Sequence, residues 1–156
     1  MSVYQLFDEV GETLRTLVPD PVGELHVRHR TYGIKVWTGT AKANREHYEA
    51  QVIGPRGVDG AEVLALEVGF HAEHPDPELN RQVIDHLRSQ ERRWRKALGD
   101  QPVAGPFLGG ADHWQRLSET WPDPNLGEPD LAFELATRLC DYLSALEPLR
   151  LRAERR

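Results

Sequence analysis

The stretch from Glu62 to His74 has the clearest alternation of apolar and polar residues in the chain. Its apolar positions are Leu64, Leu66, Val68 and Phe70, and the positions between and after them include Glu67, His71 and Glu73. A period of two is what a strand with one buried face requires. The pattern predicts a strand that displays Glu67, His71 and Glu73 on the face opposite its apolar side chains.

Three weaker alternating segments precede this strand. They centre on Leu25–Arg28, Ile34–Trp37 and Tyr48–Val52. Thr31 to Gly33 can turn the first segment into the second, and the links at 38–46 and 54–60 are short and polar. Because parallel strands need crossovers of a dozen or more residues, four strands with such links predict an antiparallel meander.

The remaining segments have helical spacing. Ser2 to Val18 carries an apolar stripe with Ser2 as a candidate N-cap, and a second stripe of about 22 residues begins at Asp76 and Pro77 and ends at Gly99. A third stripe begins at Pro129 and should end by Pro148. We also expect a short helix from Asp112 to Trp121, while Val103–Leu108 forms either an edge strand or a surface crossing.

These elements predict a two-layer α+β fold in the order α-β-β-β-β-α-(β)-α-α, with a four-stranded meander packed on an N-terminal, a long central and a C-terminal helix. We expect one domain over residues 1–148 and a disordered basic tail at 149–156. The apolar sheet face should meet the helices. The other face should carry His26, Arg28, Arg30, Lys35, Trp37, His47, Glu49, Gln51, Glu67, His71 and Glu73.

Composition narrows the class of protein. The 156 residues are 39% hydrophobic and 28% charged, values typical of a globular chain, and no run approaches the roughly 20 apolar residues that span a bilayer. The N-terminal segment lacks the basic region of a signal peptide, so we expect a cytoplasmic protein without membrane attachment. Cys140 is the single cysteine, which excludes an intrachain disulfide and is typical of a small core side chain.

The polar face of the sheet admits two interpretations. A solvated antiparallel sheet needs only cross-strand charge pairs. Alternatively, Glu67, His71 and Glu73 are candidate ligands of a divalent cation, with Glu49, Glu67 and Lys35 as candidate catalytic residues of a metal-dependent phosphoester hydrolase. Glu49-Ala50-Gln51 is similar to the acid-x-lysine strand of restriction-type nucleases, but Gln51 replaces the lysine and no aspartate lies between Asp20 and Glu49.

Arg92, Arg93 and Lys96 form a basic cluster around Trp94, a pattern that occurs in nucleic-acid-binding proteins. Cations near a helix C-terminus also complement the helix dipole, and Trp94 falls on the expected buried stripe. A net charge of −6 repels polyanions, so nucleic acid is not the expected partner.

No complete catalytic constellation is present in the sequence. We therefore interpret the chain first as a non-enzymatic binding or adaptor module that recognises a protein partner or a second copy of itself and needs no cofactor. Its expected binding surface comprises Trp37, His47, Gln51, Phe107 and Trp114. Metal-dependent hydrolysis and nucleic-acid binding are the alternatives.

Overall fold

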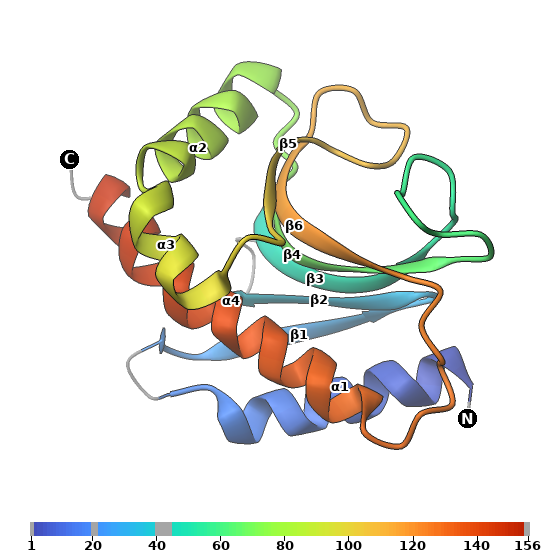
Figure 1. The fold of residues 1–156 in the computed structure, drawn as a ribbon. Helices are drawn as coiled ribbons and strands as arrows, with labels where there is room; N and C mark the ends of the chain where they lie inside the picture. Colours follow the sequence, from blue (N-terminus) through green and yellow to red (C-terminus); the bar gives the residue numbers. More distant parts are fainter. Residues whose placement is uncertain (1, 20–21, 40–44, 155–156) are drawn as a thin grey trace.

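The computed structural model describes residues 2–19, 22–39 and 45–154, with the backbone alone described at 151–154. These ranges contain four helices and six strands (Figure 1). In chain order they are α1 (Val3–Leu17), β1 (Leu25–Arg30), β2 (Gly33–Thr38), β3 (Glu46–Ile53), β4 (Ala65–Ala72), α2 (Pro77–Ser89), α3 (Glu91–Leu98), β5 (Val103–Pro106), β6 (Gln115–Pro122) and α4 (Leu131–Glu154).

The strands form one antiparallel sheet in the order β1-β2-β3-β4-β6-β5. The α+β class and the four-stranded meander are confirmed, and two further strands extend the sheet beyond β4. Val103–Pro106 forms the edge strand that the sequence left open. The short helix expected at Asp112–Trp121 is wrong, because Gln115–Pro122 instead pairs with β4 along its whole length.

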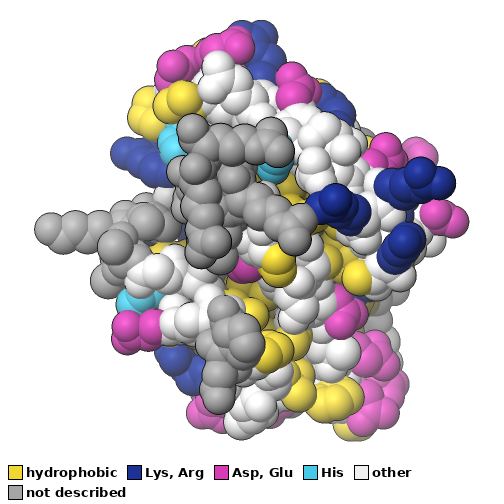
Figure 2. Space-filling view, turned by 90° about the vertical axis from the view of Figure 1, so that its left-hand side faces the viewer, with side chains coloured by type: hydrophobic (Ala, Val, Ile, Leu, Met, Phe, Trp, Pro, Cys, Tyr) yellow, Lys and Arg dark blue, Asp and Glu magenta, His cyan; other side chains and the backbone are white. Residues whose placement is uncertain are grey.

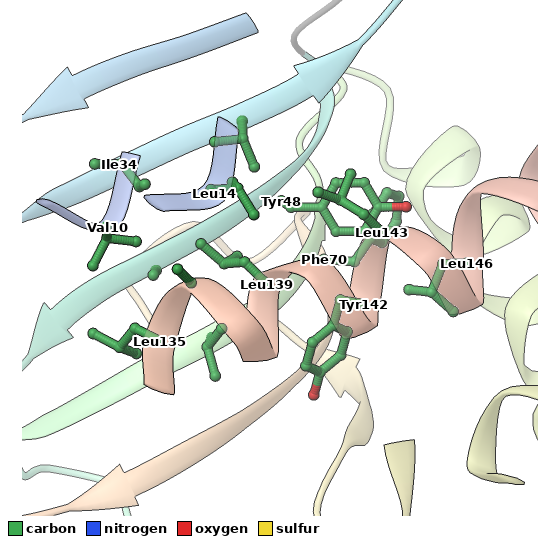
Figure 3. Packing of buried hydrophobic residues seen from close by; sticks show 14 of the residues in the cluster. Val10, Leu14, Ile34, Tyr48, Phe70, Leu135, Leu139, Tyr142, Leu143 and Leu146 are labelled. Atoms are coloured by element: carbon green, nitrogen blue, oxygen red, sulfur yellow. The ribbon is translucent and has the colours of Figure 1, made fainter. Parts of the chain in front are cut away.

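All four helices lie on one side of the sheet, and the sheet curls away from them (Figure 1). The core lies between these two layers, with α1 and α4 against the apolar face of β2, β3 and β4 (Figure 3). Fully buried side chains there include Val10, Leu14, Ile34, Tyr48, Phe70, Leu135, Leu139, Tyr142, Leu143 and Leu146. This confirms which sheet face meets the helices.

The helix starts predicted at Ser2 and Asp76 are confirmed by their hydrogen bonds. The Ser2 side chain accepts from the backbone N–H of Gln5, and the Gln5 side chain accepts from the backbone of Ser2. At α2, Asp76 accepts from the N–H of Glu78. Cys140 is half-buried beside the core and forms no disulfide.

The long central helix is divided at Gln90 into α2 and α3. The backbone of Gln90 leaves helical geometry, with φ −104° and ψ 13°. The indole Nε1–H of Trp94 donates to the carbonyl of Leu87 at 2.7 Å, which satisfies a buried acceptor at the break. The prediction of one continuous helix is therefore wrong, although Trp94 is a core residue as expected.

Helix α4 continues through Pro148 to Glu154, so the predicted helix end at Pro148 is also wrong. Leu149 is buried and its carbonyl accepts from His86 Nε2, while Arg150 pairs with Glu46 from β3. These contacts beyond the proline offset the hydrogen bond that it removes. Residues 155 and 156 of the expected tail lie outside the described residues. None of the described helices is both long enough and apolar enough to cross a bilayer.

Candidate metal centre on the inner side of the sheet

The pairing of β3 with β4 brings the predicted polar residues together. His47 lies opposite His71, and Gln51 lies opposite Glu67. Since side chains alternate along each strand, all four project from the face that does not meet the helices. The sequence predicted this sorting of polar and apolar residues, and the register adds that the two histidines are direct cross-strand neighbours.

This polar face is buried rather than solvated. The relative exposure is 0% for His47 and His71, 1% for Glu67, 4% for Glu49 and 7% for Glu73. The sheet is strongly curved, with this face on its inner side (Figure 1). The ring of Phe107, just beyond β5, packs edge-to-face on His71 at 5.0 Å between centroids. The expectation of a solvated sheet face is therefore wrong for β3 and β4.

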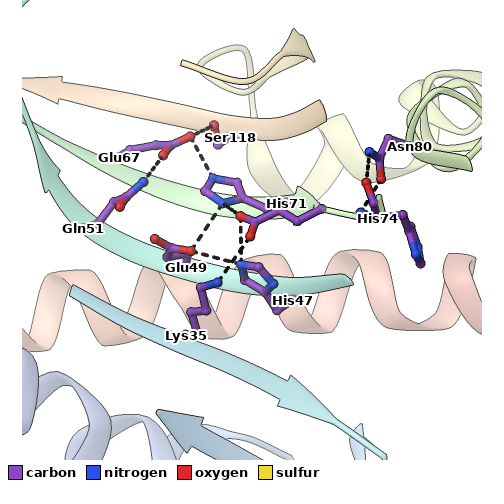
Figure 4. Close-up of polar contacts among 10 residues, drawn as sticks. Lys35, His47, Glu49, Gln51, Glu67, His71, His74, Asn80 and Ser118 are labelled. Atoms are coloured by element: carbon purple, nitrogen blue, oxygen red, sulfur yellow. Dashed lines mark hydrogen bonds and ion pairs between the residues drawn. The ribbon is translucent and has the colours of Figure 1, made fainter. Parts of the chain in front are cut away.

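Two imidazoles and two carboxylates converge within this polar face (Figure 4). His47, Glu49, His71 and Glu73 each offer one ligand atom, and these atoms lie within 4.8 Å of one another. The closest contacts are His47 Nε2 to Glu49 Oε1 at 3.0 Å, His47 Nε2 to Glu73 Oε2 at 3.3 Å, His71 Nδ1 to Glu49 Oε1 at 3.4 Å and His71 Nδ1 to Glu73 Oε2 at 3.1 Å.

These contacts have the size of a metal coordination shell. The four contacts run around a ring with sides of about 3.2 Å, and the centre of a square of that side lies about 2.3 Å from each atom, slightly longer than metal–imidazole and metal–carboxylate bonds of about 2.0–2.2 Å. The set includes two of the three predicted metal ligands, His71 and Glu73, and adds His47 and Glu49. Glu67, the third metal candidate, lies behind His71.

Glu67 orients His71 from outside the four-atom set. His71 Nε2 lies 3.0 Å from Glu67 Oε2 and donates to it, because a carboxylate can only accept. Ser118 Oγ donates to the same oxygen at 2.6 Å, and Gln51 Nε2 donates to Oε1 at 2.8 Å. Histidine ligands of metals are commonly held in this way, with the second ring nitrogen bonded to a carboxylate.

Lys35 holds Glu73 in a similar way. Its ammonium donates to Glu73 Oε1 at 3.2 Å, which leaves Oε2 directed at the two imidazoles. Lys35 therefore lies beside the cluster, as the sequence predicted, but as the ion-pair partner of a carboxylate.

The ionisation of the cluster follows from these contacts. Burial opposes the ionisation of Glu49, but hydrogen bonds from His47 and His71 outweigh it and hold the pKa of Glu49 at about 2. Burial also opposes the ionisation of Glu67 and Glu73. The charge of His71 and hydrogen bonds from His71, Ser118 and Gln51 lower the pKa of Glu67, and hydrogen bonds from His47 and His71 lower that of Glu73. Burial disfavours charge on His71 too, yet attraction to Glu67 and the surrounding hydrogen bonds raise its pKa well above the usual range. Three carboxylates are thus held ionised inside the protein.

The residues predicted as a binding surface do not form one exposed patch. Trp37 is 5% exposed and stacks on His26, and His47 belongs to the buried cluster. Gln51, Phe107 and Trp114 are half-buried, and Phe107 contacts the ring of Trp114. Two of the five residues are therefore buried, while Gln51 and Phe107 line one cleft.

The polyanion-binding candidates are separate from this site. Arg92, Arg93 and Lys96 are exposed on α3, on the helical side of the sheet. Figure 2 views the molecule from the side on which α2 and α3 lie, and Lys and Arg side chains there lie among acidic ones.

Sequence reasoning missed Ser118 and Arg116, because it placed both in a helix. Arg116 Nη1 donates to Ser118 Oγ at 3.0 Å, and Ser118 in turn holds Glu67. The signal that could have revealed them is the alternation of Arg116, Ser118 and Thr120 with Leu117, Glu119 and Trp121.

Comparisons of this chain with protein-family models, with curated proteins and with solved structures give no match.

Proposed function

We propose that this protein binds one divalent transition-metal ion through His47 Nε2, Glu49 Oε1, His71 Nδ1 and Glu73 Oε2. The observation that carries the proposal is the convergence of these four atoms, with neighbouring contacts of 3.0 to 3.4 Å. Neighbouring groups engage other atoms of the same side chains: Glu67 engages His71 Nε2 and Lys35 engages Glu73 Oε1. His71 and Glu73 are therefore held with their ligand atoms directed at the other two side chains.

The donor set favours zinc. Two imidazole nitrogens and two carboxylate oxygens suit Zn²⁺ at about 2.0–2.2 Å, and a small closed cage suits its preference for four ligands. Ca²⁺ takes six to eight oxygen ligands at longer distances, and Mg²⁺ prefers an octahedral shell of oxygens and water. Imidazole ligands disfavour both of these ions.

The ligand number supports a binding role over hydrolysis. Structural zinc sites have four protein ligands, whereas catalytic sites keep a position open for water. Glu67 and Lys35, two residues that would serve phosphoester hydrolysis, instead orient His71 and Glu73. We therefore place the metal in a non-enzymatic role, in which it binds together two central strands of the sheet.

The test begins with metal-free protein prepared by chelation. Calorimetric titration with Zn²⁺, Mn²⁺ and Mg²⁺ should give one site that prefers Zn²⁺, and thermal unfolding should shift upward with Zn²⁺. At a free-ion concentration of 100 times Kd the stabilisation is about 2.7 kcal/mol.

The variants His47→Ala and Glu49→Gln should each lose this site. The matched control is His74→Gln, because His74 pairs with Glu46 at 2.8 Å outside the cluster. Absence of stoichiometric binding by the wild type, or equal binding by His47→Ala, would contradict the proposal. Metal-dependent hydrolysis of p-nitrophenyl phosphate that disappears in Glu49→Gln would instead support the hydrolase.

A further inference from the structure

A cleft of about 690 Å³ lies beside the cluster, between the segment that follows β3 and the segment that follows β5. Its volume falls within the range of small-molecule sites, roughly 300–1,000 Å³. Glu67 and Gln51 lie on the side of the cleft nearest the cluster, and both loops contribute glycines. Figure 1 shows both loops at the inner side of the curved sheet.

One wall of the cleft is apolar and held in place. Ile53, Phe107 and Leu108 are half-buried there. The ring of Phe107 is packed edge-to-face between His71 and Trp114, with centroid distances of 5.0 Å and 5.3 Å. A Cβ at Gly109 would lie 2.6 Å from Phe107 Cε1, so the loop backbone closes tightly on the ring. A flat apolar ligand would therefore meet a preformed surface.

The cleft has an accessible positive charge and a buried negative one. Arg56 and Glu67 are its charged lining residues. The carboxylate of Glu67 is 1% exposed and already accepts from Gln51, Ser118 and His71. Arg56 is exposed and makes no ion pair within the described part of the chain. The cleft thus presents one available cation beside an apolar wall, without an accessible carboxylate of its own.

We propose that this cleft binds a small organic anion, with its apolar body against Ile53, Phe107 and Leu108 and its carboxylate at the guanidinium of Arg56. Arginine is suited to carboxylates because its planar fork donates two parallel hydrogen bonds. Burial of an aromatic body supplies most of the affinity, and the ion pair selects the anion. This proposal concerns a second ligand and does not depend on metal binding at the cluster.

The experiment uses 2-naphthoate as the anionic probe and 2-naphthalenemethanol as its neutral counterpart, titrated into the full-length ¹⁵N-labelled protein with and without Zn²⁺. The readout is the amide shifts of Gly54, Gly57, Gly109 and Gly110, which report on the two loops. Naphthoate should give saturable shifts at these glycines and bind roughly three- to fivefold more tightly than the alcohol, the range of an exposed ion pair.

Arg56→Ala should lower the affinity for 2-naphthoate to that for the alcohol. The control variant Arg92→Ala, on α3, should leave the affinity for 2-naphthoate unchanged. Equal affinities of the two probes, an unchanged affinity in Arg56→Ala, or saturable shifts only outside the two loops would each overturn the proposal. Because the amide shifts of the loops are followed with and without Zn²⁺, the experiment tests binding of the organic anion even if the protein does not bind zinc.

Discussion

His71 Nε2 lies 3.0 Å from Oε2 of Glu67, four residues earlier on the same strand. Residues four apart in a strand are separated by about 13 Å, so two such side chains meet only by leaning toward each other over the intervening same-face position. That position is Gly69, which has no side chain. Figure 4 shows Glu67 and His71 directed toward one another along β4. The contact that orients His71 therefore depends on a glycine between the two residues.

Gly69→Ala should destabilise the fold and weaken the cluster. The glycine has φ +152°, and a Cβ there would lie 2.5 Å from the carbonyl oxygen of Leu117 on β6. The strand pair would have to separate, at a cost of about 1–3 kcal/mol. Urea unfolding would measure it. Gly110→Ala is the control, because a Cβ at Gly110 meets nothing within 4 Å; equal stability of the two variants would contradict this account.

The alternation of Leu64 to Phe70 was sufficient to predict which side chains of β4 face the helices, because burial of one sheet face strongly constrains strand register. It also placed Glu67, His71 and Glu73 together. It did not predict their burial, because curvature and the position of Phe107 arise from contacts between segments far apart in the chain.

For strand β6, in contrast, the local sequence pattern predicted the wrong secondary structure. Trp114, Leu117 and Trp121 are spaced by three and four residues, and this spacing favours a helix locally. The segment is a strand because β4 would otherwise have an unpaired edge inside the protein. The pairing outweighs local preference, and Ser118 reaches Glu67 only as a result of it.

Glu67→Gln should weaken zinc binding without removing a ligand. Glu67 accepts from three donors, and an amide has only one oxygen to offer them. His71 then loses the partner that fixes its orientation, and loss of such a partner typically lowers metal affinity about 10- to 100-fold. Competition with a zinc-chelating dye would measure the change, with His74→Gln as control. Wild-type affinity in a folded Glu67→Gln protein would rule out this orienting role.

Asp123 should make the free energy of unfolding decrease as the pH falls into the acid range. Its carboxylate accepts from the backbone N–H groups of Val63, Glu62 and Leu64, and these bonds lower its pKa. A lowered pKa in the folded state contributes stability that is present above the ordinary value near 3.8 and is lost as pH falls. The same hydrogen bonds hold the segment before β4 against the residue that follows β6.

Asp123→Asn tests this dependence without new backbone strain, because asparagine also tolerates the φ of +44° found here. Urea unfolding from pH 3 to pH 7 should show the variant less stable near neutral pH, with the difference shrinking as pH falls below the ordinary pKa of aspartate. A difference that stays constant across this range would show that the carboxylate charge contributes nothing.

Arg150→Ala should be strongly destabilising, although the sequence pattern predicts that this residue lies in a disordered tail. The guanidinium lies over the ring of Phe70 at 4.9 Å from its centroid and contacts Glu46 and Glu147. Glu147 is 5% exposed and would lose its cation, and breaking a buried pair costs about 3 kcal/mol. Arg93→Ala on the exposed side of α3 should change the free energy of unfolding by less than about 0.5 kcal/mol. Chemical unfolding measures the stability of both variants. A loss of stability in Arg150→Ala alone would show that the last turns of α4 belong to the core. Equal stabilities of the two variants would show that the residues after Pro148 contribute nothing to the fold.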